Sequence, residues 1–151
     1  YTVMTKFMSG IMALLAVVAV SSCSDDSEKI IGIDDIPQTA STFISTYYPS
    51  ASVTSVTSEG KGMDTDYDVY FADGSKIEFN YDGEWKSVDA PFGATIPAGI
   101  APEAIARYVA ANYHDSGINE ISRDRRGYEV ELLNGIDLEF APDCSFIRVD
   151  K

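Results

Sequence analysis

The chain has 151 residues and a formal net charge of −13, because 24 acidic residues outnumber 11 basic ones. This charge excludes the Lys- and Arg-rich surfaces with which proteins bind nucleic acid. It also opposes flat adsorption on anionic lipid, so we expect contact with a membrane only through a lipid anchor.

The N-terminal segment has the pattern of a secretory signal peptide. Lys6 precedes a short apolar run, Ile11–Val20, which is too short to cross a bilayer as a helix. We therefore assign residues 1–22 to a signal peptide. The run leads into Val20-Ser21-Ser22-Cys23, which resembles a lipobox, so Cys23 is the expected site of lipidation. The alternative is a chance cysteine behind an ordinary signal peptide.

Residues 23–35 are interpreted as the lipidated cysteine and an acidic tether. The stretch Ser24–Glu28 resembles the acidic sequence that sends some Gram-negative lipoproteins to the outer face of the outer membrane. A solvated tether explains the same composition, because such segments bury too little apolar surface to fold. We expect an exported protein anchored to the outer membrane, facing either the periplasm or the cell surface.

Two helices are predicted, one behind Pro37 and one behind Pro102, since proline is favoured in the first turn of a helix. Pro49 ends the first helix. Both segments carry apolar residues at the spacing of one buried helical face: Ala40, Phe43, Ile44, Tyr47 and Tyr48 in the first, and Ile105, Tyr108, Val109 and Tyr113 in the second. Helices this short are marginal alone, so each must pack on a sheet.

The segment Tyr67–Asp89 recurs as Tyr128–Asp150 at a constant shift of 61 residues (128 − 67). Apolar and polar residues alternate in both copies, which is typical of strands with one buried face. The dipeptides Asp73-Gly74 and Asn134-Gly135 predict two-residue hairpin turns of the primed type, in which both residues have positive φ. Asp82-Gly83 marks a further turn, and Pro142-Asp143-Cys144 predicts a turn of another type at the same place in the second copy.

Each copy therefore predicts a helix followed by four antiparallel strands, and the fold class is α+β. The first repeat spans residues 36–89, a linker spans 90–101, and the second repeat spans 102–151. We expect one continuous sheet of eight strands with both helices packed on one face. Two separate small sheets are the alternative, although each would bury little surface.

The tandem αββββ pattern resembles the PepSY-like, beta-lactamase-inhibitory-protein-like family. The resemblance covers Ile36–Lys151, and the second copy departs from the motif at Leu132, Asn134, Cys144 and Phe146. The first copy carries the fuller motif, in Tyr67, Val69, Phe71, Asp73, Gly74, Ile77, Glu78, Phe79, Asp82, Gly83 and Trp85. The resemblance implies a periplasmic or surface lipoprotein, and the relatives that name the family are inhibitors that grip an enzyme with the exposed sheet face.

No catalytic residue is expected, and we predict a protein that is not an enzyme. His114, the single histidine, lies beyond the second helix, where a structural role suffices. Cys144 is the only cysteine besides Cys23, and it lies in a turn without an activating base nearby. No motif predicts a cofactor.

The exposed sheet face is the expected binding surface for an unidentified protein or peptide partner. Aromatic side chains flanked by polar groups are common anchors of such surfaces. The alternative for Trp85, which the sequence favours, is that it closes the rim of the core. The candidate contact residues are Asp68, Tyr70, Glu78, Asn80, Trp85, Glu129, Glu131 and Glu139.

The alternative function is a small-ligand or cation-binding surface on the acidic face or in the loop 58–66. Asp64-x-Asp66-x-Asp68 resembles the opening of a calcium loop. However, Val69 and Ser75 stand where an EF-hand requires glycine and glutamate. We therefore assign no metal ligands from the sequence.

Overall fold

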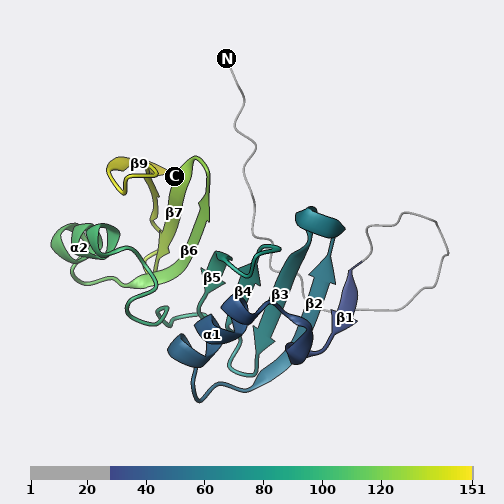
Figure 1. The fold of residues 1–151 in the computed structure, drawn as a ribbon. Helices are drawn as coiled ribbons and strands as arrows, with labels where there is room; N and C mark the ends of the chain where they lie inside the picture. Colours follow the sequence, from purple (N-terminus) through teal and green to yellow (C-terminus); the bar gives the residue numbers. More distant parts are fainter. Residues whose placement is uncertain (1–27, 151) are drawn as a thin grey trace, which may run out of the picture.

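The computed structural model describes residues 28–150, so the predicted signal peptide, Cys23 and Ser24–Ser27 lie outside the described residues. The fold is an antiparallel sheet of nine strands in chain order, with two α-helices (Figure 1). The helices are α1 (Gln38–Tyr47) and α2 (Glu103–Asn112). The strands are β1 (Lys29–Ile31), β2 (Val53–Glu59), β3 (Asp66–Phe71), β4 (Lys76–Phe79), β5 (Trp85–Asp89), β6 (Ile118–Asp124), β7 (Gly127–Leu132), β8 (Asp137–Phe140) and β9 (Phe146–Asp150).

The two repeats share one continuous sheet, as the sequence predicted. Strand β5 of the first repeat pairs antiparallel with β6 of the second, and Val88 stands opposite Ile121. The linker between the repeats lies against the start of β6, where the Ile96 N–H donates to the Ile118 oxygen at 2.9 Å. The Asn119 side chain holds the same linker by donating to the oxygens of Pro91 and Ala94, at 3.1 and 2.8 Å.

Strand β1 was not predicted, and it lies within the segment interpreted as a tether. It pairs antiparallel with β2 and places Ile31 opposite Val56. Ile31 therefore has the same place beside the first repeat that Val88 has beside the second. Val88 stands opposite Ile121, and Ile121 is the equivalent of Val56 (121 − 56 = 65). A three-residue strand thus supplies backbone partners to the outer edge of β2, which would otherwise be open.

Both helices pack on the apolar face of the sheet, as predicted. In the first repeat, Phe43 meets the edge of Phe79 with ring centroids 5.7 Å apart. In the second, Tyr108 meets Phe140 in the same way at 5.4 Å. Between the helices and the sheet lies one core, in which Val69, Ile77, Val88, Ile121, Val130 and Leu138 are fully buried.

The two turns at Asp73-Gly74 and Asn134-Gly135 differ from the prediction. Each hairpin loop has three residues, since the Phe71 N–H donates to the Ser75 oxygen at 3.0 Å across the first loop. Gly74 and Gly135 have positive φ (96° and 80°), whereas the preceding Asp73 and Asn134 do not. The two-residue primed turn is therefore wrong. A right-handed turn followed by one left-handed residue fits the strand twist equally well.

The turn at Pro142-Asp143-Cys144 is also of this kind, so the prediction of another turn type is wrong. The Ala141 N–H donates to the Ser145 oxygen, and the Cys144 N–H donates to the Ala141 oxygen, both at 2.8 Å. Cys144 has φ 68° and occupies the place of Gly83, which has φ 80°. Cys144 is the one non-glycine residue with positive φ in residues 28–150.

The left-handed conformation of Cys144 predicts an unusual order of stability. Cys144→Gly should be more stable than Cys144→Ala by about 1 kcal/mol. A Cβ in this conformation costs roughly 1–2 kcal/mol, and the greater unfolded-state freedom of glycine offsets only part of that. Urea unfolding of both variants measures the difference. The same pair at Ser145, whose φ is negative, is the control and should show the opposite order. Equal stability of the two Cys144 variants would refute the prediction.

Candidate functional site

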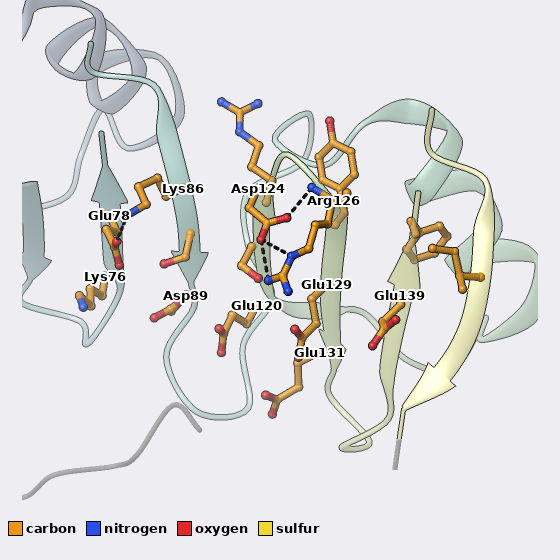
Figure 2. Close-up of a pocket in the computed structure, with 17 residues that line it drawn as sticks. Lys76, Glu78, Lys86, Asp89, Glu120, Asp124, Arg126, Glu129, Glu131 and Glu139 are labelled. Atoms are coloured by element: carbon orange, nitrogen blue, oxygen red, sulfur yellow. Dashed lines mark hydrogen bonds and ion pairs between the residues drawn. The ribbon is translucent and has the colours of Figure 1, made fainter. Parts of the chain in front are cut away.

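The sheet face opposite the helices is polar, and cross-strand pairing aligns its side chains in rows. Side chains that stand opposite each other on neighbouring strands lie about 5 Å apart. One row crosses β5 to β9 and consists only of carboxylates, which we call the acidic row. Its members are Asp89, Glu120, Glu131, Asp137 and Asp150. Figure 2 shows Asp89, Glu120 and Glu131 side by side on successive strands.

A second row runs beside the first and contains both charges, so we call it the mixed row. It consists of Asp68, Glu78, Ser87, Ser122, Glu129, Glu139 and Arg148. The basic side chains of this face pair mainly with the mixed row. Lys76 contacts Asp68 at 3.1 Å, Lys86 contacts Glu78 at 2.8 Å, and Arg148 contacts Glu139 at 2.8 Å.

The ion pairs leave the centre of the acidic row uncompensated. No ion pair of residues 28–150 includes Asp89, Glu120 or Glu131. Asp89 Oδ1 is buried and lacks a hydrogen-bond partner among the described residues. The polar face therefore holds negative charge that its own cations do not neutralise.

The middle members of the two rows line a groove of about 450 Å³: Asp89, Glu120 and Glu131 from the acidic row, and Glu78, Ser87, Ser122, Glu129 and Glu139 from the mixed row. Lys76, Glu78 and Lys86 stand at its first-repeat side, and Glu139 and Ile147 at its second-repeat side. An ion pair between Arg126 and Asp124, with 2.7 Å between Nη2 and Oδ2, lies at the β6–β7 turn. The groove therefore holds several carboxylates in its middle, where Arg126 also lies, and its lysines, Lys76 and Lys86, stand at the first-repeat side (Figure 2).

Burial and crowding raise the pKa values of the central carboxyl groups. For Glu120, burial first and then the charges of Asp89 and Glu131 raise the pKa to about 7. For Asp89, burial is again the largest cause, and the pKa rises to about 6 although Lys76 opposes the shift. The pKa of Glu129 is also raised, by burial and by Asp137. These groups gain from a positive charge placed in the groove, because it would stabilise their ionised form.

Most of the residues predicted from the sequence lie together on this face. Asp68, Glu78, Glu129 and Glu139 belong to the mixed row. Glu131 belongs to the acidic row, and Tyr70 stands opposite Lys76 on the same face, with the Lys76 Nζ 5.4 Å from its ring centroid. The structure thus brings six of the eight candidates to one surface.

Two predicted residues lie elsewhere and are corrections. Asn80 shapes the β4–β5 turn, because its Oδ1 accepts the N–H groups of Asp82 and Glu84, both at 3.0 Å. Trp85 is 8% exposed and belongs to the core. Arg123 covers its ring at 3.9 Å and donates to its backbone oxygen at 2.7 Å, so Trp85 is not an exposed anchor.

Sequence reasoning missed Asp89 and Glu120, the two most perturbed carboxyl groups. The position of Asp89 on the polar face could have been predicted, because alternation is strict along β5 after Ser87. That of Glu120 could not, because the β6–β7 register shifts between Ile118 and Glu120. This bulge lets both Ile118 and Ile121 point into the core, so the alternation that assigns faces fails there.

The loop 58–66 is smaller than the sequence suggested. Strand β2 continues to Glu59 and β3 begins at Asp66, with a short 3₁₀ turn at Gly62–Asp64 between them. Asp66 contacts Lys86 at 2.5 Å and Asp68 contacts Lys76, so two of the acids in the calcium-like motif are paired with cations. Within residues 28–150 no group of three or more possible ligands has the spacing of a metal site.

Fold and site together define a class: an α+β protein of two αββββ repeats with an open acidic sheet face. The model of a family described as "Putative beta-lactamase-inhibitor-like, PepSY-like" matches residues 65–148, which is more than half of the chain. The chain belongs to this PepSY-like family. A comparison with curated proteins finds no significant match.

Three solved structures are similar over nearly their whole length. A protein of Bacteroides vulgatus, named "putative periplasmic protein", has 38% identity and a TM-score of 0.79, covering 85% of this chain and 100% of its own. A "putative calcium-regulated periplasmic protein" of Bacteroides thetaiotaomicron has 34% identity and a TM-score of 0.78, with 82% and 97% covered. A second B. vulgatus protein, "of unknown function", has 30% identity and a TM-score of 0.77, with 83% and 100% covered.

The location of these relatives agrees with the predicted export, since all three are named as periplasmic proteins. In the part of the chain that the structure describes, no helix is long and apolar enough to cross a membrane.

The raised pKa of Glu120 predicts how stability depends on pH. Its folded pKa of about 7 exceeds the ordinary value of 4.5, so the folded state holds more protons between these values. Stability should therefore fall as pH rises through this window. Glu120→Gln should stabilise the protein by about 1–3 kcal/mol at about pH 8 and change it little at about pH 4.

Urea unfolding at the two pH values measures this effect. Glu103→Gln is the matched control, because Glu103 lies on α2 with its side chain 77% exposed, away from the groove. If Glu120→Gln stabilised the protein equally at both pH values, ionisation of Glu120 could not be the cause.

Proposed function

We propose that the chain is an exported binding module, anchored through a lipid on Cys23, that recognises a basic segment of a protein partner with its groove. The observation that carries the proposal is the centre of the acidic row: Asp89, Glu120 and Glu131 stand in a groove without ion-pair partners among the described residues. A basic ligand would supply the missing charge and lower the raised pKa values.

The length of the acidic row favours a peptide segment over a single small ion. Five neighbouring strands at about 4.8 Å spacing place its ends roughly 19 Å apart. An extended peptide rises about 3.3 Å per residue, so about six residues match this length. Lys or Arg at alternate positions would face the row. The net charge of −13 would also speed the approach of a basic partner.

Binding is the role that we propose for the groove, and its support is the charge of its lining, which contains carboxylates, amines and guanidinium groups. Inhibition of an enzyme is a narrower form of this proposal, and its support is the inhibitor-like description of the family. In that case, basic residues of the target enzyme would enter the groove of this chain.

A synthetic peptide that alternates Lys and Ser tests the charge recognition directly. We expect binding that weakens as salt rises, because screening reduces attraction between partly exposed charges. Glu120→Gln with Glu131→Gln should weaken binding at least about tenfold, or about 1.4 kcal/mol. Calorimetry near pH 6.5 in buffers of different ionisation heat should also detect proton release, because the bound cation lowers the raised pKa values.

The controls separate the groove from the general charge of the protein. Asp34→Asn with Glu103→Gln removes the same charge from two exposed residues outside the groove and should leave the affinity unchanged. Capture of envelope proteins by the chain, and by the Glu120→Gln, Glu131→Gln variant, then identifies the natural partner. Equal loss of peptide binding in both double variants would show non-specific attraction and overturn the proposal.

Calcium binding on the same face is the second candidate. Its support is the relative named as calcium-regulated, which is 34% identical to this chain, together with the oxygen-rich acidic row. Calcium takes six to eight oxygen ligands, so carboxylates of the row would have to move together around the ion. In residues 28–150 no such cluster is preformed.

A melting experiment with calcium separates the two candidates. A ligand that binds only the folded state must raise the melting temperature. If calcium is the ligand, millimolar calcium should stabilise the chain, and Glu120→Gln with Glu131→Gln should abolish the effect. An unchanged melting temperature across that range would remove calcium from consideration and leave the basic segment as the ligand class.

A further inference from the structure

The last strand exposes apolar side chains that the equivalent strand of the first repeat buries. Val88 of β5 is fully buried, whereas its counterpart Val149 of β9 is 40% exposed. Trp85 is 8% exposed, whereas its counterpart Phe146 is 37% exposed. The cause is position: β5 pairs with β6, but β9 ends the sheet (Figure 1). Edge strands usually carry devices that limit pairing, and β9 has a bulge at Ile147 and two charged residues, yet it also exposes Phe146 and Val149.

The backbone of Val149 faces the open edge. In the ladder between β7 and β8, the Leu132 N–H donates to the Ile136 oxygen at 2.9 Å. Hydrogen-bonded pairs alternate with non-bonded pairs along an antiparallel ladder, so the pair of Val130 and Leu138, two residues further on, is also hydrogen-bonded. The backbone N–H and C=O of Leu138 therefore bond to β7. Its pair with Val149 on the other side is a non-hydrogen-bonded pair. The N–H and C=O of Val149 thus point away from β8.

The internal junction shows how such an edge is completed. In the first repeat the Ala90 N–H donates to the Asn119 oxygen at 2.8 Å. By the same alternation, Val88 exchanges hydrogen bonds with Ile121. The junction needs only three opposed pairs, formed by residues 87–89 of β5. The equivalent residues of β9 are 148–150 (87 + 61 = 148).

We propose that a second copy of the chain pairs with β9, antiparallel and with the two-fold axis at Val149. The two Val149 residues would then exchange backbone hydrogen bonds and meet on the helix side, as Val88 and Ile121 do. On the other face, Arg148 of each copy would stand opposite Asp150 of the other. Two opposite-charge pairs thus complete the contact.

The charges of β9 select a second copy and this register. An axis at Arg148 would oppose two guanidinium groups, which is unfavourable between neighbouring strands. The axis at Val149 is self-complementary, because one residue of each sign flanks it. Arg148 already contacts Glu139 at 2.8 Å, so it would bridge Glu139 and the incoming Asp150. The apolar and the polar face of β9 are then both matched by the same strand.

Sedimentation equilibrium of the chain from Ser24 onward tests this contact. At about 0.15 M salt, where screening limits repulsion between the acidic copies, we expect a concentration-dependent dimer between about 1 µM and 1 mM. Val149→Lys should abolish it. Arg148→Asp should weaken it at least about tenfold, because it opposes carboxylates at two places. Arg148→Asp combined with Asp150→Arg should restore it, since the exchange recreates both pairs.

Two further measurements distinguish pairing at β9 from association through another surface. Ile30→Lys places the same charge on the opposite edge strand, where Ile30 is 84% exposed, and should leave the dimer intact. Hydrogen exchange at the Val149 amide should slow as concentration rises, and circular dichroism of each variant confirms its fold. A chain that stays monomeric throughout the range overturns the proposal, as does a dimer that survives Val149→Lys or that the charge exchange fails to restore.

Discussion

The pairing of β5 with β6 is the constraint on which the rest of the structure depends. It joins two repeats, each too small to bury a large core, into one sheet with one hydrophobic interior. Val88 and Ile121 meet there with no exposed surface. The same three pairs place Asp89 opposite Glu120 on the other face. The core and the charged site are therefore consequences of one register, and a shift of that register by one residue would exchange the two faces.

This register balances an apolar gain against an electrostatic cost. Burying Val88 and Ile121 contributes about 1.5–3 kcal/mol for each side chain. Burial of carboxyl groups and like charges on opposed residues are both unfavourable, and the raised pKa values of Asp89 and Glu120 reflect burial first and the neighbouring carboxylates second. The cost is tolerated because the apolar gain is at least of similar size. The proposed binding of a basic segment would offset this electrostatic cost, because a cation in the groove stabilises the ionised carboxylates.

The sequence was sufficient for the repeats, both helices, the eight strands within them and the polarity of each sheet face, because alternation and the constant shift are regular. It was insufficient where one residue breaks the alternation. Lys86 in β5 and Ile147 in β9 are extra residues of bulges, so Trp85 and Val88 both point into the core. The turns and β1 were missed for a related reason. Asp73-Gly74 suits two loop lengths, and Lys29–Ile31 becomes a strand only because β2 offers it an edge.

The two copies differ most where the proposed functions lie. In the first copy, the row that continues the acidic row reads Tyr70, Lys76 and Asp89, and Lys76 offsets part of the negative charge. At the equivalent positions the second copy has Glu131, Asp137 and Asp150, which extend the acidic row to the edge of the sheet. The fold therefore requires only the shared apolar half of the repeat. The polar half differs between the copies at Lys76 and Asp137 and at Ser87 and Arg148, whereas Asp89 and Asp150 are shared. The proposed binding and the proposed self-association therefore both use residues at which the copies diverge.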